Sequence, residues 1–354
     1  MRRPSTPRTR PVALVLIMVM AMLSCNLPFS QPTATPPPTA TPPPAPTLTP
    51  APQATAAGTP TIAVTHLRFP GNPGTPVQFL TDTASIGTAA QHRAPGGDDY
   101  NLNLYERPFT SQTMDYLPWV DILGAQLAWD GQWFYVSIKL QATPVNAPLT
   151  DYDAEIDVNR DGRGEYLIVA TSPKTTDWTT DGVRVYQDQD HDVGGAIPVL
   201  PDTHPGNGYE TLIFNQGQGP DPDAAWARIS PSDPATVELA FLPDAIGSST
   251  TFVWWVWADR GIRQPGWFDY NDHFTQAQAG SPLVENKQYY PVAALWGVDN
   301  TCRMAYGFTP PANMLGLCTM YAPPAPPGPA ATGTPGIILR PYPPFHTPTR
   351  EPIY

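Results

Sequence analysis

Apolar and polar residues alternate with a period of two through the middle of the chain, from about Asp98 to Asn300. In the segment FYVSIKL (134–140), Phe, Val, Ile and Leu alternate with Tyr, Ser and Lys. Because successive side chains of a β-strand point to opposite faces, this alternation predicts strands with one buried face. No stretch of this region repeats apolar residues at helical spacing over three turns without Pro or Gly.

Clusters of Gly, Pro, Asp and Asn separate the alternating segments and predict turns. The pair Asp130-Gly131 lies between VDILGAQLAW and QWFYVSIKL and predicts a β-hairpin, because a type I′ turn needs residues that tolerate positive φ. Further strands are predicted at Tyr166–Thr171, Val183–Tyr186, Glu210–Asn215, Val237–Leu242 and Phe252–Ala258. With ~8–10 strands connected in this way, we expect an all-β fold, an antiparallel two-sheet β-sandwich.

Two Pro-rich segments flank the predicted sandwich, and we expect both to be disordered. The sequence predicts a signal peptide at 1–24, a Pro/Thr/Ala-rich spacer at 25–62, an irregular lead-in with room for a first strand at 63–97, the sandwich at 98–300, a disulfide-closed loop at 301–321 and a Pro-rich tail at 322–354. Extended as polyproline II at ~3.1 Å per residue, residues 31–60 of the spacer would hold the sandwich roughly 90 Å from its attachment.

The N-terminus has the features of an export signal. Four arginines precede an apolar run from Pro11 to Leu23, which as a helix would span about 20 Å, too short for a ~30 Å hydrocarbon core. The tetrad Met22-Leu23-Ser24-Cys25 resembles a bacterial lipobox, although Met22 replaces the usual Leu. This resemblance implies lipidation of Cys25 and a lipid anchor on the outer face of the bacterial cell membrane. The alternative is ordinary cleavage near Ser24.

The charge balance argues against a nucleic-acid partner. The chain carries 31 acidic and 19 basic residues, for a net charge of −12, and it has three lysines. Because a phosphate-binding domain needs a basic face, we expect no binding of nucleic acid.

An acidic loop carries the sharpest chemical pattern in the chain. Oxygen-bearing side chains stand at positions 1, 3, 5 and 9 of DVNRDGRGE, and Gly162 at position 6 permits a sharp turn. The segment resembles the calcium loops of EF-hands and dockerins, but position 12 is Ile168 instead of the bidentate Glu. We predict a Ca²⁺ site whose ligands are Asp157, Asn159, Asp161, the carbonyl of Arg163 and Glu165. The alternative is an Asx-rich turn whose side chains cap their own backbone.

A second acidic cluster repeats the alternation at Asp188, Asp190 and Asp192. It has Val193 where the calcium-loop pattern favours Gly. It is a weaker metal candidate, and it could instead lend a ligand to the first site or form a solvated loop.

Three segments of the middle region together resemble a known type of binding domain. They are DILGAQLAWDGQWFYVSIKL, YDAEIDVNRDGRGEYLI and ARISPSDPATVELAFLPDAIG, followed by a Trp-rich strand. This order is similar to that of family-9 carbohydrate-binding modules and DOMON-like β-sandwiches, over about 200 residues. The resemblance implies ligand binding on a sandwich, commonly of sugars and in some relatives of haem.

Aromatic residues are the candidates for contact with a sugar. Trp254, Trp255 and Trp257 share one predicted strand, where Trp255 and Trp257 lie on the same face, and their residue type favours the core. Trp267 and Trp296 stand in Gly- and Pro-flanked segments and are the candidate ligand-binding residues. Exposed flat rings of this kind stack on the faces of sugars.

Cys302 and Cys318 form an even pair once Cys25 is lipidated. In an exported chain such a pair predicts a disulfide, which would close a loop of about 15 residues and stabilise the fold by roughly 3 kcal/mol. The alternative is two free thiols.

The sequence contains no GxSxG, HExxH, Walker A or GxGxxG motif, so we predict a protein that is not an enzyme. The expected function is that of a cell-surface lipoprotein whose calcium-stabilised sandwich binds extracellular carbohydrate. The alternative is a structural or adhesive surface protein without a small-molecule ligand. A glycan hydrolase is a minor alternative, because two carboxylates suffice for that chemistry.

Overall fold

The structure, a computed structural model, describes residues 64–194, 206–280 and 289–318. The chain divides into two units, Met1–Thr61 and Ile62–Tyr354, and every described residue belongs to the second. The predicted signal peptide, the lipidation candidate Cys25, the spacer and the tail 322–354 lie outside the described residues and stay predictions.

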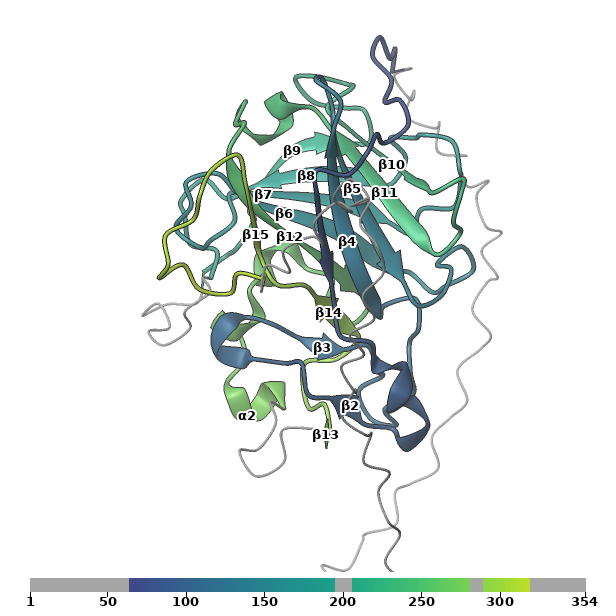
Figure 1. The fold of residues 1–354 in the computed structure, drawn as a ribbon, viewed down its shortest axis with the longest axis vertical. Coiled ribbons are helices and arrows are strands. Elements are labelled where there is room, and N and C mark those ends of the chain that lie inside the picture. Colours follow the sequence, from purple (N-terminus) through teal and green to yellow (C-terminus); the bar gives the residue numbers. More distant parts are fainter. Residues whose placement is uncertain (1–63, 195–205, 281–288, 319–354) are drawn as a thin grey trace, which may run out of the picture. The chain divides into compact units, whose positions relative to one another are not determined.

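Two antiparallel β-sheets form the body of the second unit (Figure 1). The first has five strands in the order β1-β4-β5-β11-β10. These strands are β1 (Gln78–Thr81), β4 (Ile122–Trp129), β5 (Phe134–Leu140), β11 (Thr236–Phe241) and β10 (Ala225–Ile229).

The second sheet has eight strands in the order β3-β14-β12-β6-β7-β8-β9, with β15 also paired to β12. These strands are β3 (Glu106–Arg107), β14 (Val298–Asn300), β12 (Phe252–Asp259), β6 (Asp151–Asp157), β7 (Tyr166–Thr171), β8 (Val183–Gln187), β9 (Thr211–Asn215) and β15 (Met304–Tyr306). A separate pair joins β2 (Ala94–Pro95) to β13 (Tyr289–Tyr290).

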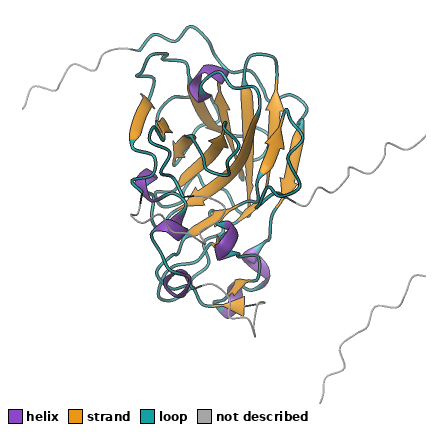
Figure 2. Ribbon diagram, turned by 90° about the vertical axis from the view of Figure 1, so that its left-hand side faces the viewer, coloured by secondary structure: helices purple, strands orange, loops and turns teal. Residues whose placement is uncertain are grey.

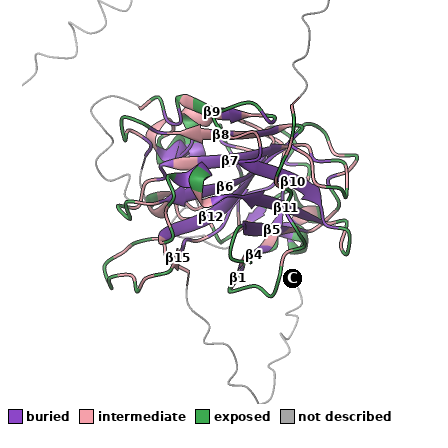
Figure 3. Cartoon of the chain, turned by 90° about the horizontal axis from the view of Figure 1, so that it is seen from above, coloured by how far each residue is buried: buried purple, intermediate pink, exposed green. Residues whose placement is uncertain are grey.

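The main hydrophobic core draws on both sheets. Its fully buried members include Val136 and Ile138 of β5, Ile156 of β6 and Trp254 of β12. Buried residues occupy the strands in the middle of the fold, while exposed residues gather in the loops (Figure 3). The period-two alternation therefore places the apolar face of each sheet against the other, as in a sandwich.

A second core covers the outer face of the eight-stranded sheet. Trp255 and Trp257 of β12 pack there with Phe268 and Tyr270, which follow β12 in the chain. Because each buried aromatic ring removes about 150–250 Å² from water, this cover holds the segment after β12 against the sheet.

Helical structure is short and lies outside the two sheets (Figure 2). The described residues contain one turn of α-helix, α2 (Gln276–Ala279), which Thr275 caps at its N-terminus. Six 3-10 turns are at Ser85–Gly87, Ala89–Gln91, Tyr100–Leu102, Pro243–Ile246, Pro265–Trp267 and Tyr270–Asp272. Within the described ranges, no helix is long and apolar enough to cross a membrane.

The predicted antiparallel all-β fold is confirmed. The nine strands β4 to β12, each of five to eight residues, agree with the ~8–10 expected from alternation. The remaining six described strands have two to four residues, too few for a periodic pattern to show. β1 lies in the lead-in 63–97, where the sequence left room for a first strand, whereas β15 lies in the loop 301–321, outside the predicted sandwich.

The predicted disulfide between Cys302 and Cys318 is confirmed. It closes the segment that follows β14 and contains β15. Backbone bonds from Arg303 N to Gly316 O and from Cys318 N to Arg303 O, both 2.8 Å, lie inside the same closed loop.

Candidate metal centre and sheet-face groove

The acidic loop connects β6, which ends at Asp157, to β7, which begins at Tyr166. One carboxylate oxygen from each of Asp157, Asp161 and Glu165 lies within 4.8 Å of the other two. Since Ca²⁺ binds oxygens at about 2.4 Å, oxygens on opposite sides of one ion are about 4.8 Å apart. The predicted alternation thus brings three of the predicted ligands into the range of a single cation.

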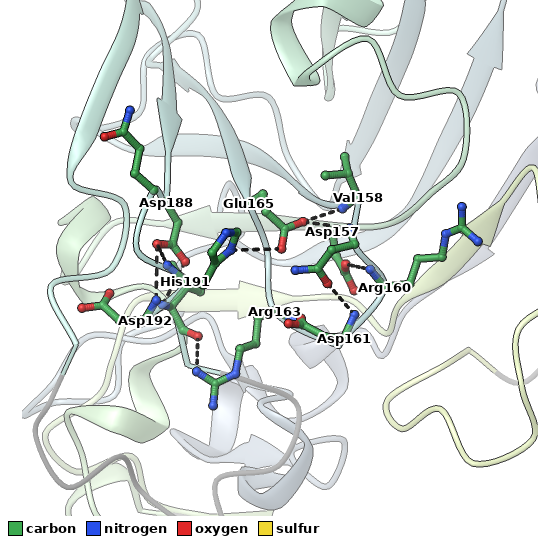
Figure 4. A network of polar contacts seen from close by, with 12 residues as sticks. Asp157, Val158, Arg160, Asp161, Arg163, Glu165, Asp188, His191 and Asp192 are labelled. Carbon is green, nitrogen blue, oxygen red and sulfur yellow. Dashed lines mark hydrogen bonds and ion pairs between the residues drawn. The ribbon is translucent and has the colours of Figure 1, made fainter.

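The loop side chains also accept hydrogen bonds from the loop backbone (Figure 4). These bonds run from Gly162 N to Asp157 Oδ2 (2.9 Å), from Asp161 N to Asn159 Oδ1 (2.8 Å), from Arg163 N to Asp161 Oδ1 (2.9 Å) and from Val158 N to Glu165 Oε2 (2.6 Å). The turn depends on Gly162, whose φ is +93°. An ionised carboxylate has about four acceptor sites, so capping of the backbone leaves room for a cation on the same group.

Burial disfavours the charged forms of the carboxylates in this loop unless a positive charge lies close to them. Asp157 and Glu165 are buried, whereas Asp161 is exposed. Burial raises the pKa of Asp157 to about 6 and the pKa of Glu165 to about 8. A bound cation would oppose this effect, because it favours the charged form of each carboxylate.

The second acidic cluster lies beside the first (Figure 4). Asp188 N donates to the carbonyl of Glu165 at 3.0 Å, and His191 Nδ1 lies 3.8 Å from Glu165 Oε1. Arg163 also connects the acidic loop to the loop after β8, because its guanidinium donates to the carbonyl of Val193 at 3.1 Å.

The second cluster has a different membership from the predicted one. Asp188 and Asp190 group with Glu210, at the same 4.8 Å limit. The Asp192 carboxylate instead accepts from Asn207 N at 2.9 Å and from Gly208 N at 3.0 Å. Sequence spacing missed Glu210 because it stands on the far side of the loop between β8 and β9.

The strand tryptophans belong to the core. Trp254 is fully buried in the inter-sheet core, and Trp255 and Trp257 are fully buried on the other face of β12. Trp267 is 39% exposed and stacks on His273, with ring centroids 5.6 Å apart. Trp296 is partly buried against the cluster that contains Phe109 and Tyr290. Of the two candidate ligand-binding tryptophans, Trp267 therefore offers more open surface.

A groove of about 420 Å³ crosses the outer face of the five-stranded sheet. We call it the sheet-face groove, and it is lined by Phe79, Leu80, Thr81, Leu123, Gly124, Ala125, Gln126, Ser137, Lys139, Ser230, Ser232, Asp233, Thr236 and Glu238. Strand register explains its shape, because Phe79, Gln126, Ser137, Glu238 and Arg228 form one cross-strand row over all five strands.

Small residues in the middle of the sheet leave the groove open. The neighbouring row runs from Thr81 through Gly124 and Lys139 to Thr236. A Cβ atom on Gly124 would meet the carbonyl of Leu80 at 2.4 Å, so the close approach of β1 to β4 requires glycine. The absence of a side chain at Gly124 thus leaves space on the sheet at this point of the groove.

Both carboxylates of the groove are paired with bases. Lys139 Nζ lies 2.5 Å from Asp233 Oδ2, and this hydrogen bond lowers the pKa of Asp233. Arg228 Nε donates to Glu238 Oε2 at 2.6 Å, while its guanidinium lies over the Trp178 ring at 4.2 Å.

Sequence patterns missed the groove. Most of its residues come from β1, β4, β5, β11 and the turn before β11, and the order of these strands appears only in the folded sheet. The one local indication is β5, where the outward residues Ser137 and Lys139 are polar.

Comparison with protein-family models, with curated proteins and with solved structures found no significant match for this chain. The resemblances to carbohydrate-binding modules and to calcium loops therefore stay predictions from the residues that carry them. What the chain binds must follow from its own side chains.

Proposed function

We propose that the protein is a lipid-anchored surface protein whose calcium-stabilised β-sandwich binds extracellular carbohydrate in the sheet-face groove. The groove carries this proposal, because its floor combines short polar side chains with one exposed aromatic ring. The N-terminal tetrad that ends at Cys25 supports the anchor, and the convergent carboxylates of the acidic loop support the calcium.

The groove presents the two kinds of contact that a sugar needs. Ser137, Thr236 and Gln126 offer hydroxyl and amide groups for hydrogen bonds to sugar hydroxyls. Phe79 is 56% exposed and offers a flat apolar face for the C–H side of a sugar ring. Because the groove crosses the strands and is open to solvent, it suits an extended glycan chain better than a compact ligand.

The charges in the groove favour binding over hydrolysis. A glycosidase needs one carboxylic acid that keeps its proton near neutral pH and a second carboxylate that is free to act. Here Lys139 lowers the pKa of Asp233, and Arg228 holds Glu238. Both acidic side chains are therefore better placed to orient a bound ligand than to act as the acid and base of a glycosidase.

One observation favours the alternative, a structural or adhesive surface protein without a small-molecule ligand. The three tryptophans of β12 are fully buried and stabilise the fold instead of forming a binding platform. In that case the sheet-face groove would bind no glycan.

The direct test is affinity electrophoresis or a pull-down of the purified protein with a panel of plant and bacterial polysaccharides. We expect retention by at least one polysaccharide, and we expect both Phe79→Ala and Ser137→Tyr to abolish it or weaken it by about tenfold or more. The first change removes the exposed ring, and the second fills the centre of the groove. A tenfold loss corresponds to about 1.4 kcal/mol.

Two variants serve as controls. Leu212→Ala removes another exposed apolar side chain, from β9 in the other sheet, and should leave retention unchanged. Trp267→Ala tests the candidate tryptophan, and loss of retention in this variant alone would move the binding site out of the groove. If every polysaccharide elutes unretained, the carbohydrate proposal is wrong.

A further inference from the structure

Four carboxylates from distant parts of the chain meet at one end of the sandwich. Asp82 directly follows β1, Glu106 lies in β3, Asp121 directly precedes β4, and Asp299 lies in β14. We call them the sheet-end group. Antiparallel pairing brings them together, because β1 pairs with β4, and Glu106 stands opposite Asp299 in the pairing of β3 with β14. In Figure 1, β3 and β14 lie side by side at this end.

The geometry of the group fits one ion. One carboxylate oxygen from each of Asp82, Glu106 and Asp299 lies within 4.8 Å of the other two. The fourth member is linked to them through Ser85, whose N–H donates to Asp121 Oδ2 at 3.1 Å and whose hydroxyl donates to Glu106 Oε1. A bond of 2.6 Å from Ile122 N to Asp299 Oδ2 then joins the two sheets.

Three of these carboxylates each keep one oxygen without a partner. In Asp82, Asp121 and Asp299, one oxygen accepts a backbone N–H, from Thr83, Ser85 and Ile122 respectively. The other oxygens, Asp82 Oδ2, Asp121 Oδ1 and Asp299 Oδ1, are buried, and no described residue offers them a hydrogen bond. Asp121 and Asp299 are fully buried as whole residues. Buried polar atoms in folded proteins almost always have a partner, and these oxygens can serve as ligands of a cation.

The neighbouring base does not neutralise the group. Arg107 follows Glu106 in β3, but its guanidinium is paired with Asp98 at 2.6 Å, and both side chains are buried. The charge of Arg107 is therefore matched by Asp98 and not by the sheet-end group.

We propose that Asp82, Glu106, Asp121 and Asp299 form a second divalent-cation site, separate from the acidic loop, that clamps the two sheets together at this end. The donors are all carboxylate oxygens, with no His or Cys among them, which selects a hard cation. Four carboxylates, three of them oriented by hydrogen bonds from backbone N–H groups, suit Ca²⁺, which accepts six to eight oxygens. The site does not depend on carbohydrate binding.

The test uses the full-length protein with the substitutions Asp157→Ala and Asp161→Ala, which remove two predicted calcium ligands from the acidic loop. We call this protein loop-disabled. In this background we expect a melting temperature that is still higher in saturating Ca²⁺ than in EGTA, and calorimetric titration with CaCl₂ should detect a remaining site. Adding Asp299→Asn should abolish the Ca²⁺-dependent rise and the corresponding heat. In EGTA the same variant should melt no lower than its parent, because one of four repelling charges is gone.

Glu106→Gln provides a second variant that keeps the acceptor for the Ser85 hydroxyl, and it should behave as Asp299→Asn does. Asp181→Asn neutralises an exposed carboxylate elsewhere and should leave the Ca²⁺-dependent rise intact. The proposal is overturned if the loop-disabled protein melts identically in Ca²⁺ and EGTA. It is equally overturned if the rise persists in both Asp299→Asn and Glu106→Gln, since the ion would then bind elsewhere.

Discussion

Asp259, the last residue of β12, shows how burial couples the ionisation of one side chain to folding. Its carboxylate is fully buried and accepts hydrogen bonds from the backbone N–H groups of Ile262 and Arg263 and from the Tyr270 hydroxyl. Burial raises its pKa to about 6, and the bond from Tyr270 only partly opposes that rise. In the unfolded chain an Asp titrates near ~3.9.

The stability of the protein should therefore depend on Asp259 between about pH 4 and pH 6. In this range the folded protein keeps a proton that the unfolded chain has lost, so this stabilisation is complete below about pH 4 and is lost as the pH rises through about 6. The loss amounts to about 3 kcal/mol. In Asp259→Asn this part of the pH dependence should be missing, although the variant is less stable overall because one amide oxygen cannot satisfy three donors.

Urea unfolding at a series of pH values measures this dependence, with Asp181→Asn as a control that keeps the wild-type profile. Calcium should be chelated throughout, so that metal binding does not contribute to the slope. If wild type and Asp259→Asn lose the same free energy over this range, Asp259 is not the group responsible.

Sequence patterns predict some of these residues and miss others for a physical reason. Asp157 and Asp161 follow one another at alternate positions of a single loop, so their convergence could be predicted from spacing. Asp82, Glu106 and Asp299 converge only through the pairing of strands, and no local pattern records that pairing. Burial of a carboxylate such as Asp259 depends on how the segment that follows β12 folds back over it, which no local pattern records.

At the level of elements, long strands were predictable and short ones were not. The sequence predicted β7 with the bounds Tyr166–Thr171 that the structure shows, because a short apolar run of strand length, buried on both faces at Leu167–Ala170, stands between turn residues. β14 and β15 have three residues each, and β1 has four. Their place in the sheets depends on tertiary contacts, among them the disulfide-closed segment around β15.

The disulfide should be a major support of β15. Cys318→Ser opens a loop whose ends are 16 residues apart, and the chain-entropy estimate for such a loop is about 3 kcal/mol. We expect a loss of this size in urea unfolding, and the same loss for Cys302→Ser and for the double variant, because all three remove one cross-link. A variant as stable as wild type would show that the backbone bonds at Arg303 hold the segment without the disulfide.

On the scale of the whole molecule, acidic side chains from different segments converge at a few places in the fold. Three groups of acidic side chains in the described residues converge within the reach of a single ion, and they lie in the acidic loop, beside it and at the sheet end. The chain as a whole carries a net charge of −12. Calcium would convert this mutual repulsion into cross-links between segments, which is the physical basis of the proposal that it stabilises the sandwich.

The thermal unfolding of the purified protein in saturating Ca²⁺ and in EGTA at neutral pH tests this claim most directly. A ligand that binds only the folded state adds about 2.7 kcal/mol per site at one hundred times its Kd, which corresponds to a rise in Tm of roughly 5–10 °C for a domain of this size. We predict such a rise, and a smaller one for the variant that combines Asp157→Ala with Asp161→Ala. Superimposable melting curves of the unmodified protein in Ca²⁺ and EGTA would contradict the calcium-stabilised sandwich.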